Sequence, residues 1–163
     1  MTQPLSALYA PPGMVIRHAI PGDAARIEQL YRQLVNNCDV CVLPERIQAL
    51  ENDLNTGLFV CEVDGVVNGT VLVSLCQDVM FKQQPFAVLE NWVVDEAMRG
   101  NGAGALLARH VEQFCVARDC SKIMLLNAVV RTEAHRFFEK IGFGGDNKRG
   151  FVKYRRDFCI NAL

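Results

Sequence analysis

The sequence has almost no net charge and no long apolar run. Lys and Arg total 17 against 18 Asp and Glu, which gives a formal net charge of -1 at pH 7. A balanced chain exerts no long-range attraction on nucleic acid or on an anionic membrane, so we expect neither as a partner. No stretch reaches the roughly 18 to 20 charge-free residues that a membrane-spanning helix needs. We therefore expect a soluble protein.

Repeats, low-complexity tracts and linkers are also missing, and no basic-then-apolar signal stands at the start of the chain. The 163 residues are the size of one ordinary domain, and 50% of them are hydrophobic, which suffices for a core without metals or disulfides. We predict one domain over residues 14–163. Residues 1–13 are proline-rich and show no periodicity, so we expect a flexible arm there.

Cysteine, by contrast, is frequent, and its pattern indicates a reducing compartment. The seven cysteines are Cys38, Cys41, Cys61, Cys76, Cys115, Cys120 and Cys159. Because their number is odd and they are scattered through apolar stretches, we expect free thiols and a cytoplasmic location. Cys38 and Cys41 have the spacing of a redox motif, but such a motif should follow an early strand and open a helix. This pair lies between two helical patterns, so we expect neither redox nor metal chemistry from it.

Hydrophobic periodicity predicts an α/β chain in the order β-α-α-β-β-β-α-β-α-β. Strands are expected at residues 14–19, 58–63, 66–76, 86–94, 122–129 and 150–157. Helices are expected near 23–34, 44–54, 103–114 and 132–141. Asp64-Gly65 predicts a two-residue hairpin. The apolar run at 122–129 predicts a parallel strand buried on both faces, so the sheet should be mixed, mostly antiparallel and flanked by helices.

The stretch at residues 99–104, RGNGAG, follows an apolar run and opens a periodic helix. Its three glycines leave the backbone uncovered, so consecutive N–H groups at the helix start can face a phosphate, aided by the helix dipole. The stretch also fits the dinucleotide pattern G-x-G-x-x-G/A, which should follow the first strand of a parallel βαβ unit. Here an antiparallel meander precedes it. We therefore favour an anion cradle over a dinucleotide site.

Three segments carry a resemblance to a known family. Residues 90–95, ENWVVD, and residues 98–104, MRGNGAG, resemble the acetyl-CoA-binding core of the GNAT acyltransferase superfamily. Residues 134–143, AHRFFEKIGF, resemble that superfamily's A-H-x-F-Y-E-K-x-G-F helix and turn. Together they cover roughly residues 86–143 in the order that the family shows. The resemblance implies a GNAT fold and acetyl-CoA as the acyl donor.

The resemblance also implies specific contacts to acetyl-CoA. The end of the strand before the glycines would pair with the pantetheine arm through its backbone, and it would splay from the strand at 122–129 so that the thioester enters the gap. The amides of the glycine-rich loop would hold the pyrophosphate. The residues expected to contact acetyl-CoA are Trp92, Val93, Val94, Arg99, Gly100, Asn101, Gly102, Ala103, Gly104, Ala105 and Phe138.

The implied chemistry needs a base. An amine with a pKa of about 10.4 is mostly protonated at neutral pH, so a proton must be removed before the amine attacks a thioester. Glu90 lies four residues before Val94 on the strand that faces the expected cleft, and several family members use a glutamate of this strand as the base. The alternative for Glu90 is an exposed or salt-bridged strand residue. We expect a backbone N–H near Val94 to stabilise the oxyanion.

Two positions depart from the family pattern. Phe138 stands where the family often has a tyrosine that protonates the leaving thiolate, and Arg131 stands where it often has asparagine. A thiolate with a pKa of about 8.5 is a tolerable leaving group without full protonation. Arg131 would meet a CoA phosphate or serve the helix start. We predict an enzyme that acetylates an amine, with a catalytically weak or inactive acetyl-CoA sensor as the alternative.

The sequence identifies neither the acetyl acceptor nor the oligomeric state. The N-terminal helices and hairpin loops would form the acceptor side, and their residues match no motif. The acceptor is therefore a small amine, an antibiotic, or a protein terminus or lysine. Family members often dimerise, but no residue of this sequence locates an interface. His110 lies on the apolar face of its helix, and we interpret it as a packed residue rather than as a catalytic group.

We predict that all seven cysteines are free thiols in the native protein. Thiol titration after denaturation without reductant should detect every one of them, because a reducing compartment gives no stable disulfides. A Cys38–Cys41 disulfide in freshly purified protein would remove two thiols from the titration and would favour the redox interpretation of that pair.

Overall fold

The computed structural model describes residues 13–158, and the chain divides after Leu125 into two compact units. Within these described residues, the first unit contains the β-sheet and three α-helices, and the second contains the last α-helix. Residues 1–12 of the predicted arm and Cys159 lie outside the described part of the chain. The other six cysteines are free thiols.

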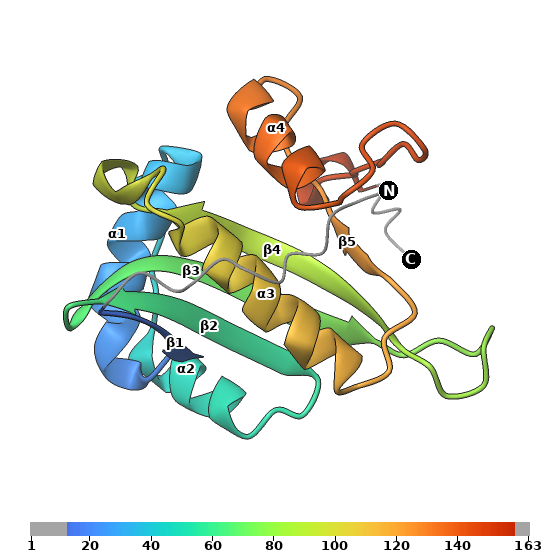
Figure 1. Ribbon diagram of the computed structural model, residues 1–163, viewed down its shortest axis with the longest axis horizontal. Helices are drawn as coiled ribbons and strands as arrows, with labels where there is room; N and C mark the ends of the chain where they lie inside the picture. The colour runs from blue at the N-terminus through green and yellow to red at the C-terminus, as the bar shows by residue number, and fades with distance from the viewer. Residues whose placement is uncertain (1–12, 159–163) are drawn as a thin grey trace. The chain divides into compact units, whose positions relative to one another are not determined.

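The first unit is built on a five-stranded sheet whose strands follow the order of the sequence (Figure 1). The strands are β1 (Met14–His18), β2 (Thr56–Val63), β3 (Val66–Cys76), β4 (Phe86–Val94) and β5 (Ile123–Leu125). β1 to β4 pair antiparallel with their neighbours, and β5 pairs parallel with β4. The prediction of a mixed, mostly antiparallel sheet is confirmed.

The turn between β2 and β3 is determined by its two residues. Asp64 has a φ of 49° and Gly65 a φ of 81°. A two-residue type I′ hairpin requires this left-handed region at both positions, which glycine adopts freely and aspartate tolerates. Val63 pairs with Val66 directly beside the turn. The predicted Asp64-Gly65 hairpin is therefore confirmed.

Helices cover both faces of the sheet. α1 (Ala24–Val35) and α2 (Pro44–Glu51) lie on one face, and α3 (Ala103–Val116) lies on the other (Figure 1). α2 ends at Glu51, three residues before the predicted end, because the Asp53 carboxylate accepts a hydrogen bond from the Asn55 N–H at 2.8 Å and turns the chain into β2. Because the helices pack on the two faces of the sheet, the connecting loops lie at the ends of the strands.

β2 shows how the sequence divides the core between the two faces. Successive strand residues point to opposite faces, so Leu58 and Val60 join the cluster under α1 and α2, whereas Phe59 points to α3. The Phe59 ring lies 4.6 Å from the His110 ring and 5.1 Å from the Phe114 ring, measured between centroids.

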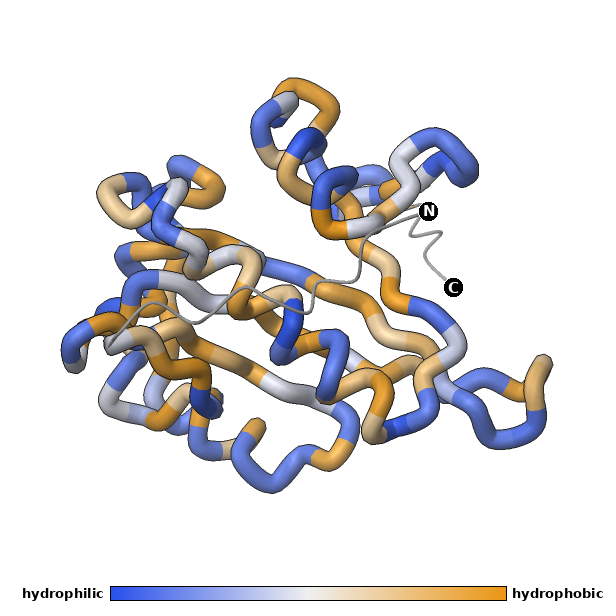
Figure 2. Tube along the Cα trace, in the orientation of Figure 1, coloured by the Kyte–Doolittle hydropathy of each residue, from blue (hydrophilic) through white to orange (hydrophobic). Residues whose placement is uncertain are grey.

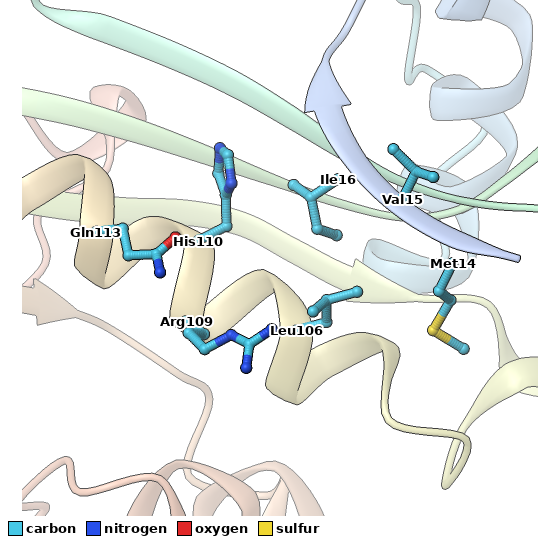
Figure 3. A pocket seen from close by; sticks show the side chains of 7 residues that line it. All are labelled: Met14, Val15, Ile16, Leu106, Arg109, His110 and Gln113. Carbon is cyan, nitrogen blue, oxygen red and sulfur yellow. The ribbon is translucent and has the colours of Figure 1, made fainter. Parts of the chain in front are cut away.

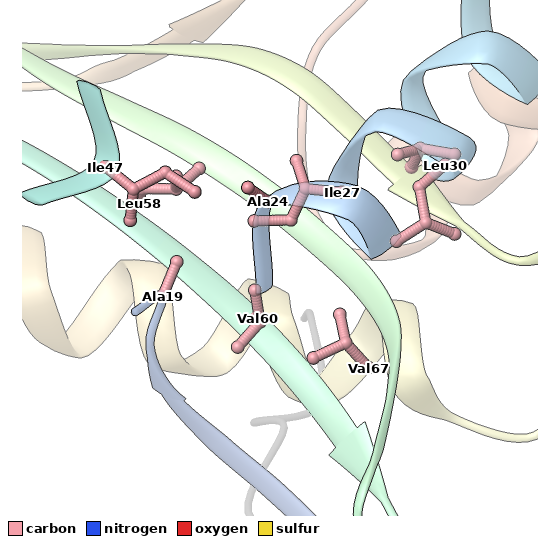
Figure 4. Close-up of a cluster of buried hydrophobic side chains, with 9 residues drawn as sticks. Ala19, Ala24, Ile27, Leu30, Ile47, Leu58, Val60 and Val67 are labelled. Carbon is pink, nitrogen blue, oxygen red and sulfur yellow. The ribbon is translucent and has the colours of Figure 1, made fainter. Parts of the chain in front are cut away.

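Figure 2 shows apolar residues concentrated along the strands and polar residues in the loops. The buried cluster under α1 and α2 (Figure 4) comprises Ala19, Ala24, Ile27, Leu30, Ile47, Leu58, Val60, Val67 and Val93.

Two of the predicted strands require correction. The strand expected at 122–129 is confined to β5, three residues long, and Met124 within it is not buried. The strand expected at 150–157 does not form, since residues 150–154 are irregular and Arg155–Asp157 is a 3₁₀ turn. A sixth strand would need a partner edge of comparable length, and β5 offers only three residues. The remaining order of strands and helices is confirmed.

The second unit consists of α4 (Thr132–Lys140) and the turns around it. Phe138 is buried, and its ring lies 5.3 Å from that of Phe137 and 5.9 Å from that of Phe143. Arg131 is the N-cap residue of α4. Across residues 13–158, none of the helices has the length and apolarity to cross a membrane.

Candidate functional site

The glycine-rich loop has the backbone geometry of an anion cradle. Gly100 and Gly102 both adopt left-handed conformations, with φ values of 83° and 91°, and Gly102 is the N-cap residue of α3. The first hydrogen bond of the helix runs from the Leu106 N–H to the Gly102 carbonyl at 3.0 Å. The N–H groups of the first helical turn precede that bond and have no acceptor within the helix. They are placed to bind an anion, which the helix dipole favours.

Asp95 fixes the segment that leads from β4 into this loop. It ends the strand and caps a 3₁₀ turn at Glu96–Met98, where its carboxylate accepts a hydrogen bond from the Ala97 N–H at 2.9 Å. Two side chains of α1 also donate to this carboxylate, Arg26 at 2.6 Å and Gln33 at 3.2 Å. Asp95 is buried, with 9% of its surface exposed. The start of the cradle is therefore attached to α1.

Arg26 extends the same attachment to β3. Its guanidinium donates to the Val67 carbonyl at 2.8 Å and to the Asn68 side chain at 3.4 Å, besides its ion pair with Asp95. The Asp95 N–H in turn donates to the Asn68 carbonyl at 2.8 Å. The Arg26 guanidinium, together with the Ala97 N–H, lowers the pKa of Asp95 below its ordinary value. The carboxylate is thus held ionised at neutral pH.

A β-bulge interrupts β4 directly after Glu90. Leu72 pairs with Glu90 and Thr70 pairs with Val93, so one residue of β3 faces two residues of β4 between these pairs. Asn91, the first of the two, has a φ of 53°. Asparagine is among the few non-glycine residues that adopt this conformation readily. A bulge bends its strand and increases the local twist, and bulges are frequent beside active sites.

The edge of β4 beyond the bulge lacks a strand partner on the β5 side. In the described part of the chain, β5 pairs with β4 only from Ala87 to Leu89. The bulge explains this length, because the added twist turns β4 away from a straight neighbour. Val93 points into the core under α1 and α2, so only its backbone faces this edge. The predicted splay between β4 and the segment at 122–129 stays a prediction.

Glu90 is exposed and lies on the α1/α2 face of the sheet. It pairs with Leu72, and paired residues of neighbouring strands share a face. Leu72 packs against the cluster under α1 and α2. The carboxylate of Glu90 therefore stands in solvent on that face, one residue before the bulge.

The structure brings the predicted residues of the first unit together because they are consecutive. Glu90, the β4 edge at Trp92–Val94 and the loop at Arg99–Ala105 follow one another from β4 to α3. Phe138 and Arg131 belong to the second unit. The sequence analysis missed Arg26 and Gln33, which hold Asp95 from more than 60 positions away in the chain. No motif or periodicity marks either residue, so no sequence signal was available.

A hollow of about 290 Å³ lies between β1 and α3 (Figure 3). His110 lines it, and burial lowers the pKa of this histidine. Its ring also packs on Phe59, which agrees with the prediction of a packed residue. β1 is separated from β4 by two strands, so the hollow is distinct from the edge that carries Glu90. The lining residues are Met14, Val15, Ile16, Leu106, Arg109, His110 and Gln113.

Comparisons with known proteins agree with this geometry. The model of the acetyltransferase (GNAT) family matches residues 26–143. Among solved structures, a provisionally assigned acetyltransferase from Agrobacterium tumefaciens is 28% identical, with a TM-score of 0.77, covering 86% of this chain and 99% of that one. A comparison with curated protein sequences finds no match.

Two more distant structures share the fold. Glucosamine-6-phosphate N-acetyltransferase from Arabidopsis thaliana is 22% identical, with a TM-score of 0.72, covering 87% of this chain and 98% of that one. An aminoglycoside acetyltransferase from an uncultured soil metagenomic sample is 16% identical, with a TM-score of 0.77, covering 90% of this chain and 98% of that one.

Replacing Asp95 by Asn should destabilise the fold in a pH-dependent way. At pH 7 we expect a loss of about 1.5–3 kcal/mol in the free energy of unfolding, the range for a hydrogen bond to a charged group. A carboxylate whose pKa is lowered by folding stabilises the fold above its unfolded pKa of about 3.9, and this stabilisation is lost as the pH falls through the folded-state pKa. Urea unfolding should therefore show the full difference from wild type at neutral pH and a shrinking difference below about pH 4.

Asp146, an exposed carboxylate, provides the matched control. Asp146→Asn should change the free energy of unfolding by less than about 0.5 kcal/mol. An Asp95→Asn effect that stayed constant from neutral to acid pH would show that the ion pair with Arg26 is not its cause.

Proposed function

The chain belongs to the acetyltransferase (GNAT) family, and we propose that it transfers an acetyl group from acetyl-CoA to a primary amine by direct attack on the thioester. The observation that carries this proposal is the continuity of the site. A stretch of β4 beyond its last pair with β5, an exposed carboxylate and a glycine-rich helix start follow one another between Glu90 and Ala105.

Two features support acetyl-CoA as the donor. The first N–H groups of α3 have no acceptor within the helix and follow a loop with two left-handed glycines, which suits the pyrophosphate. The backbone of Trp92–Val94 lies on β4 beyond Leu89, its last pair with β5, and would accept the pantetheine arm as an added strand. Arg99 and Asn101 are exposed on the same loop, where they would contact the phosphates.

The chemistry follows from an exposed carboxylate beside that edge. Glu90 removes a proton from the ammonium group of the acceptor, directly or through water. The neutral nitrogen then attacks the thioester carbon, and the Val94 N–H donates to the oxyanion that forms. The carbon–sulfur bond breaks, the electron pair leaves with the CoA sulfur, and the second proton of the nitrogen passes to the thiolate, directly or through water. The products are an amide and CoA.

The acceptor is proposed only as an amine. Two structures of the same fold are named for glucosamine-6-phosphate and for aminoglycosides as their acetylation targets. Their identities to this chain are 22% or lower, so they do not choose among amines. A panel of amines assayed with acetyl-CoA, with released thiol as the readout, would identify the acceptor class.

One observation favours a second candidate function. Phe138 is buried at the position where the family often carries a tyrosine, and phenylalanine has no proton to donate. A protein that kept the cradle and lost the chemistry would bind acetyl-CoA as a sensor. A measurement of acetyl transfer to amines distinguishes the enzyme from the sensor, because only the enzyme turns over acetyl-CoA.

Gly102→Val should weaken acetyl-CoA binding at least tenfold, which is about 1.4 kcal/mol, because a side chain at the cradle blocks the approach of a phosphate. Isothermal titration calorimetry measures the change. Gly104→Val places the same side chain within α3, at a glycine whose backbone is helical, so the substitution adds no backbone strain. It should also weaken acetyl-CoA binding.

Gly65→Val is the control for backbone strain. Gly65 has a left-handed φ of 81° like the cradle glycines, but it lies in the β2–β3 hairpin. Its substitution should leave the affinity unchanged in folded protein. Unchanged affinity in folded Gly102→Val and Gly104→Val would refute the cradle, and NADH binding of comparable strength would favour a dinucleotide site instead.

Glu90→Gln should lower turnover by about 10² or more at neutral pH, the usual contribution of general base catalysis, with little change in the affinity for acetyl-CoA. Steady-state kinetics and calorimetry test both parts. Glu51→Gln makes the same chemical change at the exposed end of α2 and should leave turnover unchanged. Turnover within twofold of wild type in Glu90→Gln would remove this residue from the mechanism.

Phe138→Tyr should leave turnover within about twofold of wild type, because a thiolate with a pKa of about 8.5 leaves without a dedicated acid. A several-fold rise in kcat would show instead that the site is built for an acid it lacks. If wild type and Phe138→Tyr both bind acetyl-CoA and acetylate no amine in the panel, the sensor replaces the enzyme.

A further inference from the structure

Residues 148–158 of the second unit, KRGFVKYRRDF, form a segment that is both basic and aromatic. Five of its first nine residues are lysine or arginine, and none of these nine is acidic. Every residue of the segment is exposed. The chain as a whole is balanced in charge, so its net charge does not reveal this local excess. A local excess of positive charge on an exposed segment attracts anions.

Most of these cations have no carboxylate partner. Arg156 forms an ion pair with the neighbouring Asp157 at 3.8 Å. In the first unit, by contrast, Arg26 is partly buried and paired with Asp95 at 2.6 Å. The cations of the segment that form no ion pair with any residue of the described range 13–158 are Lys148, Arg149, Lys153 and Arg155.

Three aromatic side chains are exposed among these cations. Phe151 is 87% exposed, Tyr154 is 59% exposed and Phe158 is 50% exposed. The guanidinium carbon of Arg156 lies 5.0 Å from the centroid of the Tyr154 ring. An aromatic ring in water forgoes the free energy that its burial would provide. Exposed rings between unpaired cations therefore suit a ligand that has both negative charges and flat apolar surfaces.

We propose that this basic–aromatic segment binds single-stranded nucleic acid, with its lysines and arginines on the phosphates and its rings stacked on the bases. A single strand offers a charged backbone together with base faces that are open to stacking. A membrane fits less well, because an interfacial segment gathers its apolar residues on one face of a helix, and residues 150–154 are not helical. An acidic polypeptide would pair with the cations and leave the rings in water.

Fluorescence anisotropy with labelled oligouridylate and oligothymidylate of equal length tests the proposal on the full chain, without acetyl-CoA. Both oligonucleotides should bind, and the logarithm of the binding constant should fall with the logarithm of the salt concentration by about 0.7 for each phosphate contacted. The tighter of the two identifies RNA or DNA as the natural ligand. An abasic oligonucleotide of the same length keeps the phosphates and lacks the bases. It should bind at least tenfold more weakly.

Variants of exposed residues separate stacking from charge. Phe151→Ala should weaken binding of oligouridylate at least fivefold without changing the salt dependence, because it removes only a stacking surface. Val152→Ala is the matched control at an adjacent exposed side chain that has no ring, and it should stay within twofold of wild type. Arg155→Gln should reduce the salt slope by about 0.7. The same change at Arg46, an exposed arginine of α2, should leave the slope unchanged.

Three results would overturn the proposal. Equal affinities for the abasic and the base-containing oligonucleotides would show that only charge is recognised. Equal affinities of Phe151→Ala and Val152→Ala would show that the ring does not stack on a base. Sedimentation of the protein with phosphatidylserine vesicles, combined with an absence of binding to both oligonucleotides, would assign the segment to a membrane surface instead.

Discussion

The candidate site depends on one ion pair, between Arg26 of α1 and Asp95 at the end of β4. The carboxylate receives the guanidinium at 2.6 Å, the Gln33 amide at 3.2 Å and the Ala97 N–H at 2.9 Å. A buried carboxylate with this many donors is stabilised in its charged form, and removing a partner would leave an unsatisfied charge. The pair therefore fixes where β4 stops and where the chain turns toward α3. Both ends of the site, the strand edge and the cradle, are set by that position.

Two backbone features next to the Arg26–Asp95 ion pair shape the candidate acetyl-CoA site. The bulge at Asn91 twists β4 after Glu90, and within residues 13–158 β5 pairs with β4 over three residues only, all before the bulge. The left-handed glycines then bring the chain into α3, whose first N–H groups have no acceptor within the helix. A donor that spans both places needs an extended arm for the edge and an anion for the helix start. Acetyl-CoA has both, joined in the same molecule.

The local parts of this arrangement could be predicted from the sequence. Asp64-Gly65 indicated the hairpin, and the three glycines of residues 100–104 indicated the cradle, because each depends on backbone preferences of adjacent residues. The ion pair could not be predicted, since Arg26 and Asp95 are 69 positions apart and neither stands in a motif. The short β5 was missed for a related reason. Apolar character at 122–129 predicts a strand, but its length is set by the twist of its neighbour.

The most direct test is a titration of isotope-labelled protein with acetyl-CoA, followed by the backbone amide signals in NMR. The account predicts that the largest shifts occur at the amides from Gly100 to Leu106 and at Trp92–Val94, in one saturable process. Shifts centred on Arg109 and His110 would place the ligand in the hollow beside β1 and would contradict the account. An absence of shifts at saturating acetyl-CoA would contradict it as well.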